Sequence, residues 1–193
     1  ASPHARLSVT PQESPLLEEW MSAQRFDLGL GEQTATPPGT QAEVLLTLDE
    51  VAVLPSGHTL AKRPVLGLGD FAGLPFVSLS VDDPYRRQID ALFAQAGVQR
   101  ALRVETHSAA AVCAMVQQGL GVAVVNPLTA LAAVQGSGGA LVLRRLAFSV
   151  PFSVSMVRPL FRATLPEVVP MLHALRLEAQ ALGEKFREMA SAA

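Results

Sequence analysis

The chain has 193 residues, of which 49% are hydrophobic, so it is long and apolar enough to bury one substantial core or two small ones. Its 15 Lys and Arg stand against 17 Asp and Glu, and the net charge of −2 excludes a broad basic field that would hold a nucleic-acid backbone. The single cysteine, Cys113, excludes an internal disulfide and paired-cysteine metal or redox sites, which favours a reducing cytoplasm. Apolar stretches such as 109–116 are too short to cross a bilayer, so no membrane segment is expected.

The first forty residues predict a strand, a helix and a second strand. The first strand is expected at 7–9 and the second at 26–30. Between them, Ser14 is expected to cap a helix that has Pro15 at its first position. This order is typical of a βαβ unit. The apolar run 44–54 then predicts one long strand.

From residue 76 onward, short apolar strands alternate with amphipathic helices. Strands are expected at 76–80, 102–105, 121–125, 141–143 and 152–157. Helices are expected after the capping residues Asp83, Ser108 and Asn126, and a last helix carries an apolar stripe from Val168 to Phe186, with Pro170 in its first turn. This alternation predicts an α/β fold with a mostly parallel sheet covered on both faces.

The order of elements favours two α/β, Rossmann-like lobes joined by two crossover strands. Lobe I is expected to hold residues 1–56 and 150–193, and lobe II residues 57–149. Open α/β sheets bind ligands at the carboxyl ends of their strands, so a ligand cleft is expected between the lobes.

Several sequence segments resemble the regulatory domain of LysR-type transcription regulators. They are PQESPLLEEW at 11–20, DLGL at 27–30, LDEV at 48–51, VLP at 53–55 and GH at 57–58. Three further segments are similar, within that family, to regulators of diaminopimelate decarboxylase in lysine biosynthesis: VETHSAA at 104–110, VCAMV at 112–116 and VVNPLTAL at 124–131.

The resemblance implies a periplasmic-binding-protein-like fold of type 2 and a cytoplasmic homo-oligomer, dimer or tetramer, that senses a small-molecule effector. The implied effector is diaminopimelate, and the resemblance implies that lysine opposes its effect. The family reads promoter DNA through an N-terminal winged helix-turn-helix, which we expect to lie outside this chain, together with the first strand and helix of lobe I. No cofactor, no metal and no membrane partner are implied.

Diaminopimelate carries two amino-acid head groups, so its site needs donors for two carboxylates and acceptors for two ammonium groups. Ser78, Ser80 and the helix start at 83–87 follow a predicted strand, and free N–H groups at a helix start favour an anion. Arg86 is a candidate for a bidentate grip on a carboxylate. The alternative is that the two serines only decorate a strand and that Arg86 is a solvated helix residue.

A second group of candidates follows the next strand. Thr106 and Ser108 are candidate donors to the effector, Glu105 is a candidate acceptor from an ammonium group, and His107 lies beside them. The alternative for Ser108 is a helix cap, and a lone histidine near a cap is often only structural or exposed.

Two further candidates are Glu13 and Asn126. Glu13 is the best acceptor in lobe I, against the alternative that it only stabilises a helix dipole beside Ser14. Asn126 is expected to cap a helix first and to contact the effector second.

A solute-binding protein of a transport system is the competing function, because it shares the two-lobe fold. An enzyme is less favoured. The chain has no Gly-x-Ser-x-Gly segment and no histidine pair with metal spacing, and the glycines around Gly67 and Gly69 do not form a phosphate loop. Cys113 shares a helix face with apolar residues, which favours a buried, inert thiol over a redox sensor.

Overall fold

The computed structural model describes residues 6–12, 15–32 and 36–191. Contacts divide the chain into two units, Ala1–Thr47 with Ser153–Ala192 as unit 1, and Leu48–Phe152 as the body of unit 2. Both division points lie inside strands, β2 (Thr40–Asp49) and β9 (Pro151–Pro159), so these are the two connecting strands. The first division comes before residue 56 because β3 (Val51–Pro55) pairs with strands of unit 2.

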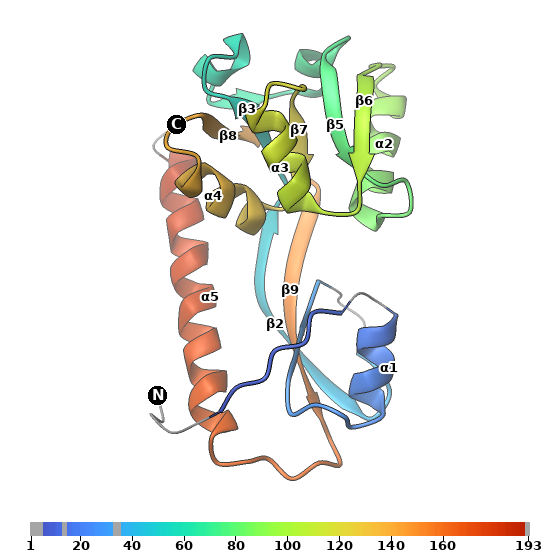
Figure 1. Cartoon of the computed structure of the whole chain (residues 1–193), viewed down its shortest axis with the longest axis vertical. Helices are drawn as coiled ribbons and strands as arrows, with labels where there is room; N and C mark the ends of the chain where they lie inside the picture. The colour runs from blue at the N-terminus through green and yellow to red at the C-terminus, as the bar shows by residue number, and fades with distance from the viewer. Residues whose placement is uncertain (1–5, 13–14, 33–35, 192–193) are drawn as a thin grey trace. The chain divides into compact units, whose positions relative to one another are not determined.

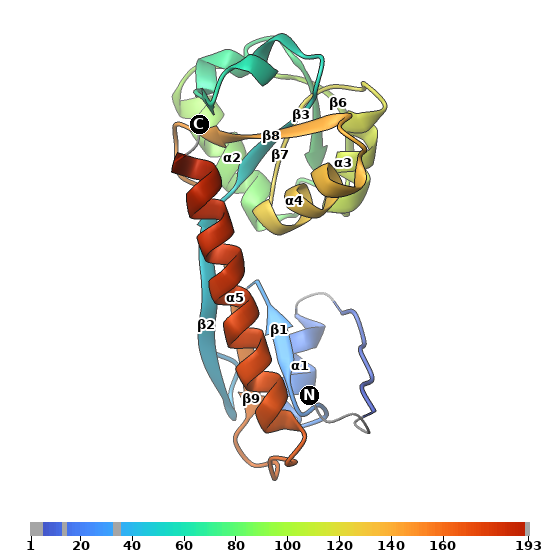
Figure 2. The same ribbon diagram turned by 90° about the vertical axis from the view of Figure 1, so that its left-hand side faces the viewer.

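Unit 1 is a three-stranded sheet between two helices (Figures 1 and 2). The helices are α1 (Leu16–Ser22) and α5 (Val168–Ser191), and the strand order is β1 (Gly29–Gly31), β9, β2. Met21 is fully buried, and a Cβ at Gly29 would lie 3.1 Å from its sulfur, so the glycine lets α1 approach β1 closely. On α5, Leu172 and Ala179 are buried seven residues apart, as expected for one helix face.

The strand expected at 7–9 is wrong. The described residues 6–12 contain no strand, and Leu7 and Val9 are 67% and 75% exposed. A strand needs a neighbour for its backbone groups, and β1 takes β9 as an antiparallel partner instead, so unit 1 has no βαβ unit here. Ser14 lies outside the described residues, and Pro15 stands at the N-cap position of α1 and not inside it.

Unit 2 holds the remaining elements. Its strands besides β3 are β4 (Val65–Leu66), β5 (Pro75–Leu79), β6 (Ala101–Thr106), β7 (Ala123–Val125) and β8 (Leu141–Leu146). Its helices are the 3₁₀ turns η1 (Thr59–Lys62) and η2 (Leu68–Phe71), and α2 (Pro84–Gln95), α3 (Ala109–Gln117) and α4 (Pro127–Gly136). The strand order is β4-β8-β3-β7, and a parallel bridge between Phe76 and Val122 places the β5-β6 pair beside β7.

The sheet of unit 2 is covered on both faces, as expected. Figure 1 shows α3 and α4 on one side and α2 on the other. The α3 face is aliphatic, with Val77, Val112 and Val125 buried in one cluster. The α2 face is aromatic, where Phe76 and Phe93 pack edge to face with ring centroids 6.3 Å apart. Since strand residues alternate between faces, Ser78 shares the α2 face with Phe76.

The sheet is mixed and not mostly parallel. β4-β8 and β5-β6 are parallel, whereas β3 runs antiparallel to both β7 and β8. The run 44–54 is also two strands and not one, because β2 ends at Asp49 and β3 begins at Val51. The N–H of Glu50, between them, donates to the Val150 carbonyl at 2.9 Å.

The helix starts of unit 2 agree with the sequence. Asp83, Ser108 and Asn126 each stand at an N-cap position and accept a hydrogen bond from the first turn of the following helix. In unit 1, Pro170 lies in the first turn of α5, as expected. Among the helices of the described residues, none combines the length and the apolar character needed to cross a membrane.

Candidate functional site

The parallel pairing of β5 with β6 brings two groups of expected site residues to one edge of the sheet. Ser78 stands opposite Glu105 in the register, and the Ser80 N–H donates to the Thr106 carbonyl at 2.9 Å. Asn126 follows β7, which runs parallel to β5, and therefore lies at the same carboxyl edge. Parallel strands present their following loops at one edge, where α/β sheets bind ligands.

The helix starts at this edge are capped. An oxygen of the Asp83 carboxylate accepts from the N–H groups of Tyr85 at 2.8 Å and Arg86 at 2.9 Å. The Asn126 side chain accepts from the Thr129 N–H at 2.8 Å. At the start of α2 a carboxylate therefore already occupies the position that was expected to receive an anion, and a second anion there is disfavoured.

Arg86 faces into the protein. Its Nη1 donates to the Leu79 carbonyl at 2.6 Å and to Glu105 Oε2 at 3.3 Å, and its Nε donates to Asp90 Oδ2 at 2.7 Å. Only 8% of its side chain is exposed. The guanidinium group thus ties α2 to the ends of β5 and β6, and the solvated alternative for this residue is excluded.

The groups that solvent reaches at this edge come mainly from the end of β6. The Glu105 side chain is 48% exposed, His107 and Ser108 are exposed, and Ser80 and Thr106 are half-buried. Ser78 is buried at 3% exposure, so it is poorly placed to reach a ligand. Glu13 lies outside the described residues.

Glu50 was not among the site residues predicted from the sequence. Its side chain is 1% exposed, and it comes directly before β3, whose first residue Val51 stands opposite Val125. A buried carboxyl group therefore lies at the same edge as Asn126. The sequence feature that could have indicated it is a charged residue inside the apolar run 44–54, because charged side chains are rarely buried without a specific role.

A groove of about 480 Å³ lies beside α2 in unit 2. Arg86, Asp90, Phe93, Arg100 and Leu102 are among its lining residues. Arg100 stacks on Phe93 with its guanidinium carbon 4.1 Å from the ring centroid, and burial lowers the pKa of this arginine. Of the expected site residues, Arg86 lines this groove. The groove therefore lies beside the ion pairs of Arg86 and Asp90, and not at the carboxyl ends of β5 and β6.

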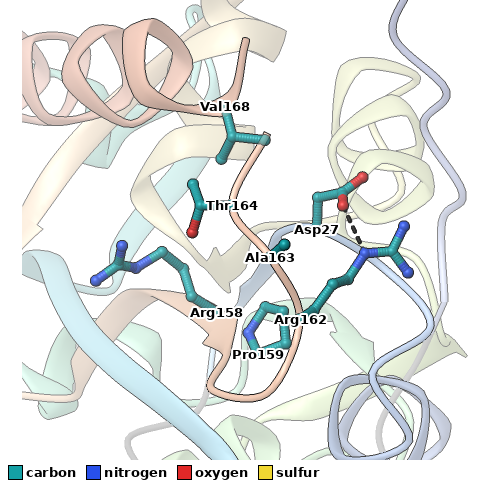
Figure 3. Close-up of a pocket in the computed structure, with 7 residues that line it drawn as sticks. All are labelled: Asp27, Arg158, Pro159, Arg162, Ala163, Thr164 and Val168. Atoms are coloured by element: carbon teal, nitrogen blue, oxygen red, sulfur yellow. Dashed lines mark hydrogen bonds and ion pairs between the residues drawn. The ribbon is translucent and has the colours of Figure 1, made fainter. Parts of the chain in front are cut away.

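Unit 1 has a much smaller hollow, of about 20 Å³, between the end of β9 and the start of α5 (Figure 3). Arg162 is turned toward Asp27 and donates to its Oδ1 at 2.7 Å, whereas Arg158 points away from both. This volume holds about one water molecule, which is too small for an amino-acid effector.

The described residues contain no group of three or more His, Cys, Asp or Glu that could hold a metal ion. Cys113 is buried on α3, as expected, and desolvation raises the pKa of its thiol to about 11. The thiol is therefore protonated and unreactive near neutral pH.

Residues 1–180 match the family model described as the LysR substrate binding domain. The chain belongs to this family. It is 51% identical over 187 residues to the transcriptional activator protein LysR of Escherichia coli (strain K12), an alignment that covers 90% of this chain and 59% of LysR. It is 32% identical over 124 residues to the regulatory protein NocR of Agrobacterium tumefaciens (strain T37), which covers 64% of this chain and 41% of NocR. The chain thus spans about half the length of these curated relatives.

Two solved structures share the fold described here. HinK, a LysR family regulator from Pseudomonas aeruginosa, has a TM-score of 0.69 at 23% identity and covers 87% of this chain and 57% of its own. Full-length BenM has a TM-score of 0.66 at 15% identity and covers 89% of this chain and 57% of its own. The expected LysR-type regulatory domain, with its two-lobed α/β fold, is confirmed.

Proposed function

We propose that this substrate-binding domain senses diaminopimelate or lysine for a regulator of lysine biosynthesis, and that the effector binds at the carboxyl edge of β5 and β6. The observation that carries the proposal is the 51% identity with the activator LysR over 90% of the chain. The fold alone does not separate a regulator from a solute-binding protein of a transport system, but both curated relatives are named as regulators.

The chemistry of this edge supports an amino-acid ligand. Glu105 offers a half-exposed carboxylate, which attracts an ammonium group. The hydroxyl groups of Ser80, Thr106 and Ser108 are donors of the kind that a carboxylate needs. Glu105 is therefore the proposed ammonium acceptor and these three residues are the proposed carboxylate donors, with His107 and Asn126 beside them.

The remaining features of the regulator are also proposals, since the chain spans 59% of LysR. We propose that promoter DNA is read by a winged helix-turn-helix outside this chain and that the regulator works in the cytoplasm as a dimer or tetramer, without catalytic activity. Helix α2 is the proposed pairing surface of unit 2. Leu102, which is 46% exposed and lines the groove beside α2, supplies apolar surface of the kind that such pairing buries.

Calorimetry on the 193-residue chain tests the effector. Diaminopimelate and lysine should both bind, and Glu105→Gln should weaken both by about 1–3 kcal/mol, because each loses a charge-assisted bond from its ammonium group. Ser80→Ala should weaken diaminopimelate more than lysine if its hydroxyl pairs with the second carboxylate, which lysine lacks. Glu184→Gln, an exposed carboxylate on α5, is the matched control and should change neither affinity. Absence of binding by the unmodified chain would contradict the proposal.

A further inference from the structure

Four charged side chains form a continuous network of ion pairs between the two ends of β6. Glu105, near the carboxyl end of β6, pairs with Arg86 at 3.3 Å, and Arg86 pairs with Asp90 at 2.7 Å. Asp90 also pairs with Arg100, which directly precedes β6. Negative and positive side chains alternate along this network, so each charge lies next to an opposite one.

The burial of these side chains differs in a way that indicates their roles. The two arginines are 8% and 11% exposed, whereas Asp90 is 35% and Glu105 is 48% exposed. The guanidinium carbon of Arg100 also lies over the rings of Phe76 and Phe93, at 4.6 and 4.1 Å from their centroids. The two arginines are therefore the buried members of this network, and Glu105 is its most exposed member.

Arg86 is held by three groups of the protein at once: Leu79, Glu105 and Asp90. Turning its guanidinium group toward a ligand would break these bonds and leave the Leu79 carbonyl without this donor. Removing one partner from a buried ion pair is costly, because the other charge stays desolvated. The expected direct grip of Arg86 on an effector carboxylate is therefore disfavoured by its own surroundings.

We propose that Arg86 is a positioning residue, which holds the Glu105 carboxylate at the sheet edge as the receptor for an ammonium group of the effector. This inference rests on the proposed function. A carboxylate has about four acceptor positions, so one bond to Arg86 leaves capacity for a ligand ammonium. Holding a long, half-exposed side chain in place before binding reduces the rotamer entropy that binding would otherwise lose. Asp90 and Arg100 keep Arg86 in this position from the other side.

The test is a double-variant cycle with Arg86→Gln and Glu105→Gln, measured by calorimetry with diaminopimelate and lysine, which both carry ammonium groups. Arg86→Gln should weaken both ligands about tenfold in the unmodified background. In the Glu105→Gln background it should add no further loss, since its effect passes through Glu105. Arg87→Gln removes the same charge from the exposed neighbouring position on α2 and should leave both affinities unchanged.

Pimelate, which has the two carboxylates but no ammonium group, distinguishes the two roles of Arg86 directly. Its affinity, measured by NMR titration at millimolar concentration, should be the same for the unmodified chain and for Arg86→Gln. A loss for pimelate, or additive losses in the cycle, would overturn the positioning role and return Arg86 to a direct carboxylate contact.

Two variants keep the inference testable if Arg86→Gln does not fold. Arg86→Lys keeps the charge without the planar fork, and Asp90→Asn leaves Arg86 in place without one of its partners. Each should weaken diaminopimelate and lysine in the unmodified background and have no further effect in the Glu105→Gln background. If the unmodified chain binds neither ligand, the proposed function fails and this inference fails with it. If the chain binds both and the cycle is additive, only the inference fails.

Discussion

Arg176 holds both carboxylate oxygens of Glu43, with Nε 2.8 Å from Oε1 and Nη2 2.7 Å from Oε2. This bidentate pair joins α5 to β2 across 133 residues of sequence. The hydrogen bond from Arg176 lowers the pKa of Glu43. The two side chains are 42% and 40% exposed, so solvent screens the pair and its contribution to stability is modest.

The first prediction concerns this pair. A carboxyl group whose pKa is lowered by folding stabilises the fold at pH values above its ordinary pKa of 4.5. This stabilisation is lost as the pH falls through the lowered pKa. Glu43→Gln should therefore lower the thermal midpoint slightly at pH 7, and the difference from the unmodified chain should vanish in acid. Differential scanning calorimetry from pH 7 to pH 3 measures this, with Glu184→Gln as the control. A difference that stays constant from pH 7 to pH 3 would show that the charge is not its cause.

The second prediction concerns the cap of α2. Asp83→Ala removes the acceptor for the Tyr85 and Arg86 N–H groups and should lower the free energy of unfolding by about 0.5–2 kcal/mol. Urea unfolding followed by circular dichroism gives this value. Asp82→Ala changes the exposed neighbouring carboxylate and should have little effect. Equal effects of the two variants would assign the loss to general charge and not to capping.

The third prediction concerns Gly121, which precedes β7. A Cβ at this position would lie 2.4 Å from the Pro75 carbonyl oxygen. Pro75 and Gly121 directly precede Phe76 and Val122, which form a parallel β-bridge, so their backbones lie side by side. Gly121→Ala should destabilise the chain by about 1–3 kcal/mol, the usual cost of overpacking. Gly136→Ala on α4, where no atom lies within 4 Å of the added Cβ, should instead stabilise it by up to about 1 kcal/mol. Thermal unfolding of both variants compares them, and a neutral Gly121→Ala would mean that β5 and β7 separate easily.

The fourth prediction concerns the Cys113 thiol. Burial raises its pKa from 9.0 to about 11, so its contribution to stability is complete below pH 9 and is lost as the pH rises toward 11. The urea midpoint of the unmodified chain should fall more steeply between pH 9 and pH 11 than that of Cys113→Ala. Iodoacetamide at pH 8 should label the folded chain far more slowly than the urea-unfolded chain. Equal labelling rates in the two states would contradict the burial of the thiol.

Much of the candidate site could be predicted from sequence, because it depends on hydrogen bonds that span few residues. Asp83 with Pro84, Ser108, and Asn126 with Pro127 marked three helix starts, and each cap accepts from an N–H group two or three positions further along. The helices after β5, β6 and β7 therefore followed from local chemistry. The grouping of these strand ends at one edge followed from the alternation of strands and helices. The resemblance of long segments then identified the family.

The direction of β3, the break at Glu50 and the orientation of Arg86 were decided only by the tertiary structure. An apolar run reads the same whether its strand pairs in parallel or antiparallel, and β3 finds its partners in β7 and β8, far along the chain. Arg86 likewise looks like a solvent-facing or ligand-facing residue in its helix, until β6 brings Glu105 to it from 19 positions away. Local patterns determine where helices begin, but the partner of a strand or a charge is set by which distant segments pack against it, since backbone and charged groups that are buried must be satisfied wherever the fold places them.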